Sequence, residues 1–264
     1  MRKTPVLFVG PPGIGKTAIT IQKYDYTEVV LLSSMVEEDI SGIPYREGAN
    51  ECRTIPLFIQ RLIQKKQEGV KNICLFFDEL DKARREVADT MLSVITNPEK
   101  FRIPEDVHIV AACNPPEWGG GDGISPAMMS RFSVIMFEPN IKQWAEYILN
   151  KYQQYSEVAV DFVNLVLHGE IPLLEVHGEG YSWRLTCPRS LENCLRAFLY
   201  EKDNYRELIY GLVTAKVASR LQMLFATHES YVDEQEEYIN SFQRKALKVT
   251  GKIKQPVRVP LKNN

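Results

Sequence analysis

The stretch from Gly10 to Thr17, which reads GPPGIGKT, decides the fold of this chain. It matches the phosphate-loop pattern GxxxxGK[ST]. An apolar run, Pro5 to Val9, precedes it, and a segment with helical spacing, Gly15 to Tyr24, follows it. A phosphate loop needs a strand before it and a helix after it, so this context argues against a chance glycine-rich turn.

The residue types of this loop suit a nucleotide. Glycines permit a backbone whose N–H groups point inward, and the helix N-terminus adds its positive dipole. We expect Lys16 to reach the β- and γ-phosphates of ATP and the Thr17 hydroxyl to ligate Mg²⁺. The residues expected to contact the nucleotide are Pro11, Pro12, Gly13, Ile14, Gly15, Lys16, Thr17 and Ala18.

Beyond the loop, short apolar runs alternate with amphipathic segments, which is typical of an α/β fold with a parallel sheet. Continuous apolar runs are expected in such a sheet because helices cover both faces of its strands. The segments between the runs predict helices, and the last of these should end at Asn97-Pro98 because proline stops a helix. The expected strands are Pro5 to Val9, Glu28 to Leu32, Asn72 to Phe77, Val107 to Ala112 and Ser133 to Phe137, and the expected helices are Gly15 to Tyr24, Ile55 to Gln67 and Arg84 to Asn97.

Polar residues follow two of these runs. Asp78 and Glu79 come directly after the third, and Asn114 comes after the fourth. Ligands of open α/β sheets bind beyond the carboxyl ends of the strands, so we expect Asp78 to hold Mg²⁺ and Glu79 to polarise the attacking water. Asn114 would hold that water. The alternatives are that the acids cap the next helix and that Asn114-Pro115 forms a turn.

Two arginines are indicated as functional residues only by the order of the motifs along the chain. Arg131 follows a short helical segment before the fifth strand, and Arg189 begins a later helix. In isolation either arginine is an ordinary solvated side chain.

The order resembles that of the AAA+ ATPases, with Walker A at Gly10 to Thr17 and Walker B at Asp78-Glu79. In the same resemblance Asn114 corresponds to sensor 1, Arg131 to the arginine finger and Arg189 to sensor 2. Within the superfamily the chain is most similar to the MoxR-like group. The supporting segments are Glu38 to Pro44, Ala112 to Glu117, Ser130 to Phe132 and Pro188 to Ser190.

The resemblance implies a five-stranded sheet of order 5-1-4-3-2, a helical lid, and a ring, usually a hexamer, with ATP between neighbouring subunits. Arg131 would then act on a neighbour's nucleotide. The resemblance further implies a remodelling chaperone, since MoxR-like proteins work as such, frequently beside a partner with a von Willebrand factor A domain. An insertion that faces the ring in that group would correspond to Ile43 to Arg53, with Tyr45 to Glu47 near its tip.

The chain departs from the AAA+ pattern at two places. The first strand begins almost at Met1, whereas these domains normally carry a helix and an adenine-contacting segment before it. Adenine recognition then falls on the lid, or its segment is absent from this chain. The other departure is the glycine-rich Trp118 to Gly123, expected to be a flexible loop that lets the finger reach across an interface, with a second phosphate site as the alternative.

We expect a nucleotide-binding domain over residues 1–139, a helical lid over 140–250 and a basic flexible tail over 251–264. After residue 139 the strand signal largely stops. Between the second and third lid helices, Glu170 to Thr186 is rich in Gly and Pro and predicts a loop or short hairpin. The expected lid helices are Lys142 to Gln154, Val158 to His168, Ser190 to Lys202, Tyr205 to His228 and Asp233 to Thr250.

Composition excludes several classes of protein. The 264 residues are 44% hydrophobic, with 32 basic and 34 acidic side chains and a net charge of −2, which is ordinary for a soluble globular protein. The five cysteines form no CxxC pair and read as reduced thiols, and the four histidines form no zinc motif. No apolar run has the roughly 20 residues of a membrane span. We therefore expect a cytoplasmic protein with no membrane association.

The leading interpretation is an ATP-hydrolysing ring that remodels a protein partner. A nucleic-acid motor or loader on the same core stays open, supported by the basic tail and Lys65-Lys66 but disfavoured by the near-neutral charge. A nucleotide-gated scaffold without hydrolysis is less compatible with Glu79 and Arg131. A small-molecule kinase is the least favoured interpretation, because no region for binding a phosphate acceptor can be recognised in the sequence.

Overall fold

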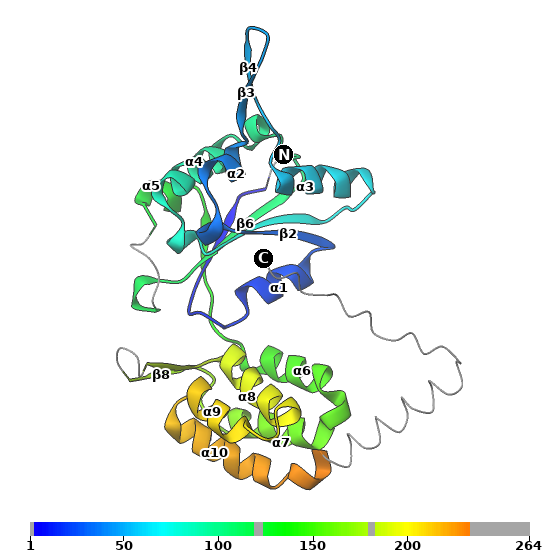
Figure 1. Cartoon of the computed structure of the whole chain (residues 1–264), viewed down its shortest axis with the longest axis vertical. Coiled ribbons are helices and arrows are strands. Elements are labelled where there is room, and N and C mark those ends of the chain that lie inside the picture. The colour runs from blue at the N-terminus through cyan, green and yellow to red at the C-terminus, as the bar shows by residue number, and fades with distance from the viewer. Residues whose placement is uncertain (1–2, 119–123, 179–182, 233–264) are drawn as a thin grey trace, which may run out of the picture. The chain divides into compact units, whose positions relative to one another are not determined.

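A computed structural model describes residues 3–118, 124–178 and 183–232 of the chain. These described residues form two compact units, drawn in Figure 1: one lies within residues 1–140 and includes Cys187–Arg189, and the other lies within residues 141–186 and 190–264. Three predicted features lie outside the described residues: most of the Trp118 to Gly123 loop, the helix from Asp233 to Thr250, and the basic tail.

The first unit is built on one parallel sheet of five strands, in the order β2-β5-β6-β1-β7. Numbered one to five along the chain, these strands have the order 5-1-4-3-2, so the predicted α/β topology is confirmed. All four pairings are parallel, which requires crossover connections that lie over the faces of the sheet. The strands are β1 (Val6–Val9), β2 (Tyr26–Leu31), β5 (Ile73–Asp78), β6 (His108–Cys113) and β7 (Ser133–Met136).

Apolar side chains on both faces explain why these strands read as continuous runs. Along β5, Leu75 and Phe77 face one hydrophobic cluster and Cys74 and Phe76 face another, and all four are fully buried. Figure 1 shows α1 (Lys16–Lys23) on one face of the sheet, with α2 (Glu37–Ser41), α3 (Leu57–Gln67) and α4 (Arg85–Thr96) on the other. Helix α4 ends directly before Asn97-Pro98, as predicted. The short α5 (Pro126–Met129) precedes β7.

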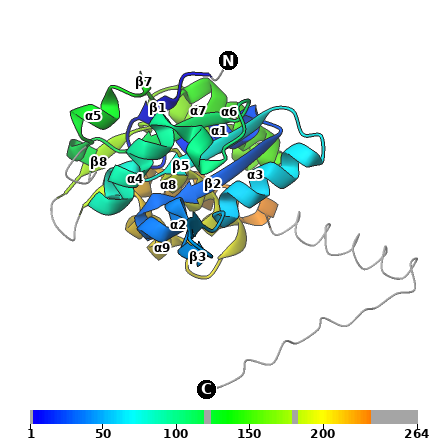
Figure 2. The ribbon, with the colours of Figure 1, turned by 90° about the horizontal axis from the view of Figure 1, so that it is seen from above.

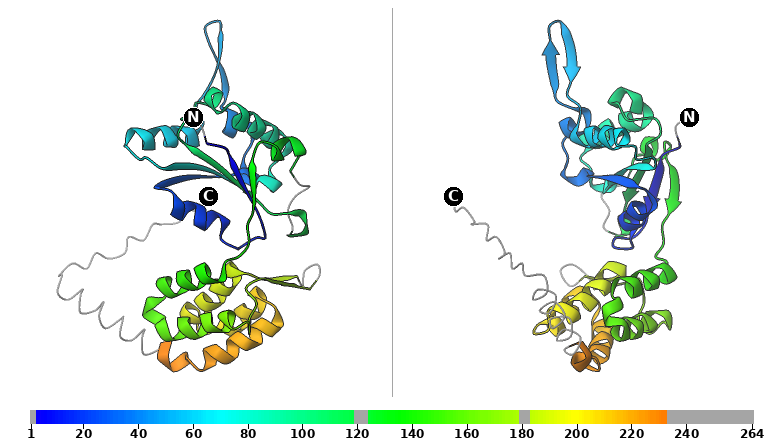
Figure 3. Two further views of the ribbon diagram at one scale, coloured as in Figure 1. Left: turned by 180° about the vertical axis from the view of Figure 1, so that it is seen from behind. Right: turned by 90° about the vertical axis from the view of Figure 1, so that its right-hand side faces the viewer.

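Between β2 and α3 the chain forms structure that we did not predict from periodicity. Helix α2 has only five residues, too few for a helical pattern to be recognised. It leads into an antiparallel hairpin, β3 (Pro44–Glu47) and β4 (Asn50–Arg53), which coincides with the insertion suggested at Ile43 to Arg53. Seven of its eight strand residues are exposed. Figure 3 shows the hairpin projecting from the first unit, and Figure 2 shows β3 beside α2.

The second unit is helical, with one small hairpin. Its core contains Trp144, Phe162, Phe198 and Phe225, with the rings of Phe198 and Phe225 stacked at a centroid distance of 4.4 Å. The hairpin lies within Glu170 to Thr186, where a loop or hairpin was predicted. The elements are α6 (Ile141–Lys151), α7 (Ser156–Leu167), β8 (Glu175–His177), β9 (Arg184–Thr186), α8 (Pro188–Tyr200), α9 (Tyr205–Leu212) and α10 (Ala215–Ala226).

The prediction of one helix from Tyr205 to His228 is wrong. The helix breaks between α9 and α10, where Val213 is extended and fully buried and Thr214 begins the next helix. The Thr214 hydroxyl donates to Glu175 at 3.0 Å. Burial of Val213 and this bond stabilise a break that helical periodicity does not reveal.

Two negative findings concern the described residues alone. None of their helices has both the length and the apolar character needed to cross a bilayer. All five cysteines lie in this part of the chain, and none of them forms a disulfide.

Candidate functional site

The phosphate-loop pattern folds into a tight turn between β1 and α1. Gly13 and Gly15 have φ angles of +76° and +98°, which side-chain-bearing residues rarely adopt. Gly10 is required for a different reason, because a Cβ there would lie 2.2 Å from the carbonyl oxygen of Phe137. The glycines of the pattern therefore serve backbone conformation and close packing.

The remaining predicted loop residues surround this turn. Ile14 is buried, 5% exposed, and holds the loop against the unit, whereas Ala18 on α1 is exposed. Pro11 and Pro12 are half-buried on the loop. These positions leave the loop accessible to a ligand while its base is packed.

Lys16 is folded back onto its own loop. Its side chain is 8% exposed, and its ammonium donates to the carbonyl oxygens of Gly10 at 2.7 Å and Pro11 at 2.8 Å and to Asn114 Oδ1 at 2.9 Å. Burial lowers the pKa of Lys16, and the nearby carboxylates of Asp78 and Asp81 offset part of that effect. The predicted sensor residue and the phosphate-loop lysine are thus in direct contact.

Thr17 and Asp78 form the candidate metal site. The Thr17 hydroxyl donates to Asp78 Oδ2 at 2.6 Å, and Asp78 Oδ1 accepts the backbone N–H of Glu79 at 2.9 Å. One hydroxyl and one carboxylate suit Mg²⁺, which prefers oxygen ligands and takes the rest from water and substrate phosphates. The described residues contain no cluster of three His, Cys, Asp or Glu that could bind a metal without such help.

Glu79 adopts a left-handed backbone conformation, with φ of +56°. The Ser33 hydroxyl donates to its Oε2 at 2.5 Å, and the Lys82 ammonium donates to its Oε1 at 3.1 Å. The hydrogen bond from Ser33 is the main reason that the pKa of Glu79 lies below the usual value for Glu, and Lys82 acts in the same direction. Glu79 is therefore an ionised carboxylate held in one orientation.

Asn114 lies just beyond β6, and its position depends on a residue that we did not single out from the sequence. Its backbone N–H donates to Asp81 Oδ1 at 3.0 Å. Neither Asp81 nor Ser33 belongs to the motif residues that we predicted. Asp81 lies two positions after Glu79, so its proximity to the site could have been anticipated, whereas Ser33 is 46 residues away in sequence.

Arg131 does not join this set. Its Nε donates to Thr96 Oγ1 at 2.8 Å, and its guanidinium also bonds the Ala127 carbonyl and the Ser130 hydroxyl. These partners belong to α4 and to the α5 segment, and none belongs to the phosphate loop. The structure therefore does not place Arg131 on the nucleotide site of its own chain.

Arg189 is the second residue of α8, and Cys187–Arg189 group with the first unit. Its backbone N–H donates to the Gly13 carbonyl at 3.1 Å. A Cβ on Gly13 would lie 2.5 Å from Cys187 Sγ, so this segment packs closely on the loop. The function of the Arg189 guanidinium stays a prediction.

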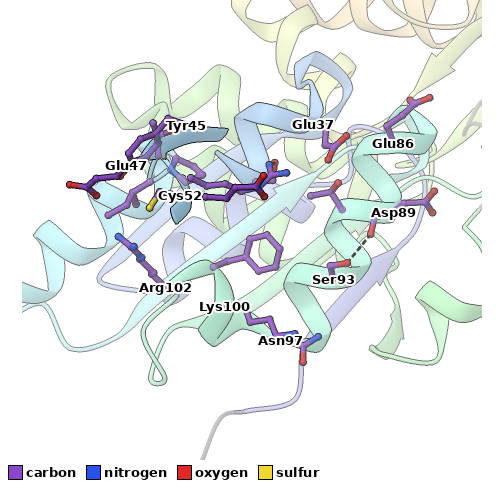
Figure 4. A pocket seen from close by; sticks show the side chains of 18 residues that line it. Glu37, Tyr45, Glu47, Cys52, Glu86, Asp89, Ser93, Asn97, Lys100 and Arg102 are labelled. Carbon is purple, nitrogen blue, oxygen red and sulfur yellow. Dashed lines mark hydrogen bonds between the residues drawn. The ribbon is translucent and has the colours of Figure 1, made fainter. Parts of the chain in front are cut away.

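A cavity of about 1030 Å³ lies elsewhere in the first unit, beside the β3–β4 hairpin and α4. Figure 4 shows Glu37, Glu86 and Asp89 toward one end of it and Arg102 toward the other. None of the predicted site residues lines this cavity. Its size therefore does not make it the nucleotide site.

Residues 5–132 match the family model of the AAA domain (dynein-related subfamily). This range contains the phosphate loop, Asp78, Glu79, Asn114 and Arg131. Among proteins with curated functions, none matches the chain.

Solved structures with similar folds include a T158V variant of RuvB from Thermotoga maritima, at 16% identity and a TM-score of 0.42 over 84% of this chain and 61% of that one. Another is Thermotoga maritima RuvB described as a Holliday junction branch migration motor, at 15% identity and a TM-score of 0.42 over 84% of this chain and 61% of that one. A third is Hsp104 in a closed state with ATPγS and FITC-casein, at 14% identity and a TM-score of 0.50 over 79% of this chain and 42% of that one. This chain thus spans less than two thirds of each. With the sheet order and the phosphate loop, the comparisons show a P-loop AAA+ fold.

Proposed function

We propose that this protein is an ATPase that works as a subunit of a ring and remodels a protein partner. The observation that carries the proposal is the convergence of Lys16, Thr17, Asp78, Glu79 and Asn114 at the carboxyl end of one parallel sheet. Ligand sites of open α/β folds lie at that end. These groups include a cation for phosphate, oxygen ligands for Mg²⁺, a carboxylate and an amide.

Each group has a distinct task in ATP hydrolysis. The Lys16 ammonium would leave its carbonyl partners and bind the β- and γ-phosphates. Thr17 and Asp78 would hold Mg²⁺, which would neutralise phosphate charge. The hydrogen bond between Thr17 and Asp78 keeps the two oxygen ligands adjacent.

Glu79 would orient and polarise the attacking water, with Asn114 beside it. Ser33 and Lys82 bond one oxygen each of the Glu79 carboxylate, and a carboxylate has further lone pairs with which to accept a water proton. Because its pKa is low, Glu79 is ionised at neutral pH, as this task requires.

We base the proposal of a ring on the position of Arg131. Its partners Thr96 and Ala127 lie away from its own loop, so we propose that it completes the site of a neighbouring subunit. An arginine acting in trans stabilises the charge on the transferring phosphoryl group. We propose a homo-oligomer, most simply a hexamer, in which Arg189 also responds to the nucleotide.

For the partner we propose a protein, in line with the MoxR-like resemblance, including one with a von Willebrand factor A domain. The exposed hairpin supports contact with another protein, since all four residues of β3 are exposed and Tyr45 among them is 47% exposed. The absence of disulfides among the five cysteines favours a reducing compartment such as the cytoplasm.

The direct test separates nucleotide binding from turnover. Lys16→Ala should abolish tight binding of a fluorescent ATP analogue, because it removes the cation that faces the phosphates. Glu79→Gln should retain binding and lose phosphate release. Matched controls are Lys23→Ala and Glu86→Gln, which alter exposed residues of α1 and α4 and should leave both measurements unchanged. Normal turnover by Glu79→Gln would exclude the proposed role of Glu79.

Assembly is tested separately with the same turnover-deficient protein. Light scattering of Glu79→Gln should show a large increase in mass with ATP and Mg²⁺ and none without nucleotide. A monomer under both conditions would contradict the ring and favour a scaffold or kinase.

A further inference from the structure

Asp81 is a buried acid beside the candidate site, and the proposed reaction assigns it no task. It lies in the short turn η2 (Leu80–Lys82) that follows β5, and it is 7% exposed. Its Oδ1 accepts the Asn114 backbone N–H at 3.0 Å. Its Oδ2 is buried and has no hydrogen-bond partner among the described residues.

This arrangement is costly, because a buried carboxylate normally needs an ion pair and several hydrogen bonds. Within residues 3–118, 124–178 and 183–232, no basic side chain forms an ion pair with Asp81. Asp81 nevertheless acts on two neighbouring groups. Burial lowers the pKa of Lys16, and Asp81 offsets part of that effect. Burial raises the pKa of Cys113, and Asp81 adds to that effect. Departures from local rules of this kind are expected at functional sites.

Asp81 bonds a segment of the chain, at Asn114, that lies beyond the strand pairing of the sheet. The pairing of β6 with β1 ends at Cys113, one residue before Asn114. Two prolines, Pro115 and Pro116, follow Asn114 and can donate no backbone hydrogen bond. The carboxylate of Asp81 is therefore the acceptor that ties the Asn114 backbone to the turn after Glu79.

From Asn114 the contacts continue to the phosphate loop, because Asn114 Oδ1 accepts from the Lys16 ammonium at 2.9 Å. If Lys16 turns to a phosphate, as the proposed function requires, that contact is lost and the side chain of Asn114 is released. The backbone bond to Asp81 does not involve Lys16, so it can keep Asn114 in place during this exchange.

We infer that Asp81 is a positioning residue for ATP hydrolysis: its Oδ1 holds the backbone of Asn114 so that the Asn114 side chain stays beside the turn that follows Glu79 once Lys16 has engaged the nucleotide. The inference rests on the proposed ATPase function. It requires a hydrogen-bond acceptor at residue 81 and does not require the negative charge.

The test uses two substitutions that keep the branching of the side chain at Cγ. Asp81→Asn keeps an acceptor for the Asn114 N–H, and Asp81→Leu removes it. We expect Asp81→Leu to lower kcat about 10- to 100-fold, the size of effect that a small misplacement of a reacting group produces. Binding of the fluorescent ATP analogue should be unchanged, and Asp81→Asn should restore most of the wild-type kcat. Asp89→Leu, at an exposed position of α4, is the control and should be silent.

Wild-type kcat in Asp81→Leu would overturn the inference, and so would an Asp81→Asn protein as slow as Asp81→Leu. Equal losses of binding and kcat would also overturn it, because they indicate general damage to the site. Absence of turnover in the wild type would instead refute the proposed function.

A second measurement does not depend on turnover or on the folding of Asp81→Leu. Hydrogen exchange of the Asn114 amide in nucleotide-free wild type should be slowed at least about tenfold relative to an unprotected amide, and Asp81→Asn should keep this protection. Exchange at the rate of an unprotected amide in the wild type would refute the hydrogen bond and the inference with it.

Discussion

The bond between Thr17 and Asp78 makes a quantitative prediction about the nucleotide-free protein. Three variants define a double-mutant cycle: Thr17→Val, Asp78→Ala and the two combined. Valine keeps the volume of threonine and removes only the hydroxyl that donates to Asp78 Oδ2 at 2.6 Å. Alanine at position 78 removes that acceptor and also the acceptor of the Glu79 N–H.

The expected free energies of unfolding follow from these contacts. A hydrogen bond to a charged group contributes about 1.5–3 kcal/mol, and the lower end applies because both side chains are half-buried. Thr17→Val should therefore cost about 1.5 kcal/mol, and Asp78→Ala about 2.5 kcal/mol because it loses a second bond. The double variant loses the shared bond only once, so it should also cost about 2.5 kcal/mol.

Urea unfolding of the four proteins without nucleotide or Mg²⁺ measures the cycle. A double variant that costs about 4 kcal/mol, the sum of the two single effects, would mean that the hydroxyl and the carboxylate do not interact. In phosphate-release assays, each single variant should also need more Mg²⁺ for half-maximal turnover, since each removes an oxygen ligand. An unchanged Mg²⁺ requirement in both would refute the metal site.

Three further predictions concern other parts of the protein. Because a hydrogen bond from Ser33 lowers the pKa of Glu79, Ser33→Ala should raise that pKa and move the acidic limb of kcat/KM to higher pH; an unmoved limb would show that Glu79 does not set it. Arg131→Ala should bind ATP yet hydrolyse it about 10³-fold or more slowly. Mixing it with Lys16→Ala should restore part of the turnover, and inactivity of mixed rings at every ratio would exclude action in trans. Phe162→Ala in the second unit should cost about 3–5 kcal/mol in urea unfolding, because its ring is fully buried, and a cost below about 1 kcal/mol would contradict that packing.

The strands and the central site residues were predictable because their signals are local. Asp78, Glu79 and Asn114 each follow a continuous apolar run, and parallel strands bring their carboxyl ends to one edge of a sheet. Once β5 and β6 are recognised as neighbours, proximity of these residues follows from topology alone.

The features that were missed depend on contacts distant in sequence or on very short elements. Ser33 reaches Glu79 only because β2 pairs with β5, and a serine after a strand carries no signal of its own. Val213 interrupts a helical pattern because it is buried against the rest of the second unit. The left-handed conformation of Glu79 likewise reflects the tight turn into η2, which no spacing of residues reveals.

The self-contacts of Lys16 have a consequence for which ligands can compete for it. Its ammonium donates to two loop carbonyls and an amide oxygen. Discrimination between two ligands is the difference between their binding free energies. A neutral ligand group would interact with the lysine no more favourably than these carbonyl and amide dipoles do. Only a ligand with concentrated negative charge gains from the exchange. We therefore expect this loop to select polyphosphates over nucleosides before any contact with the base is made.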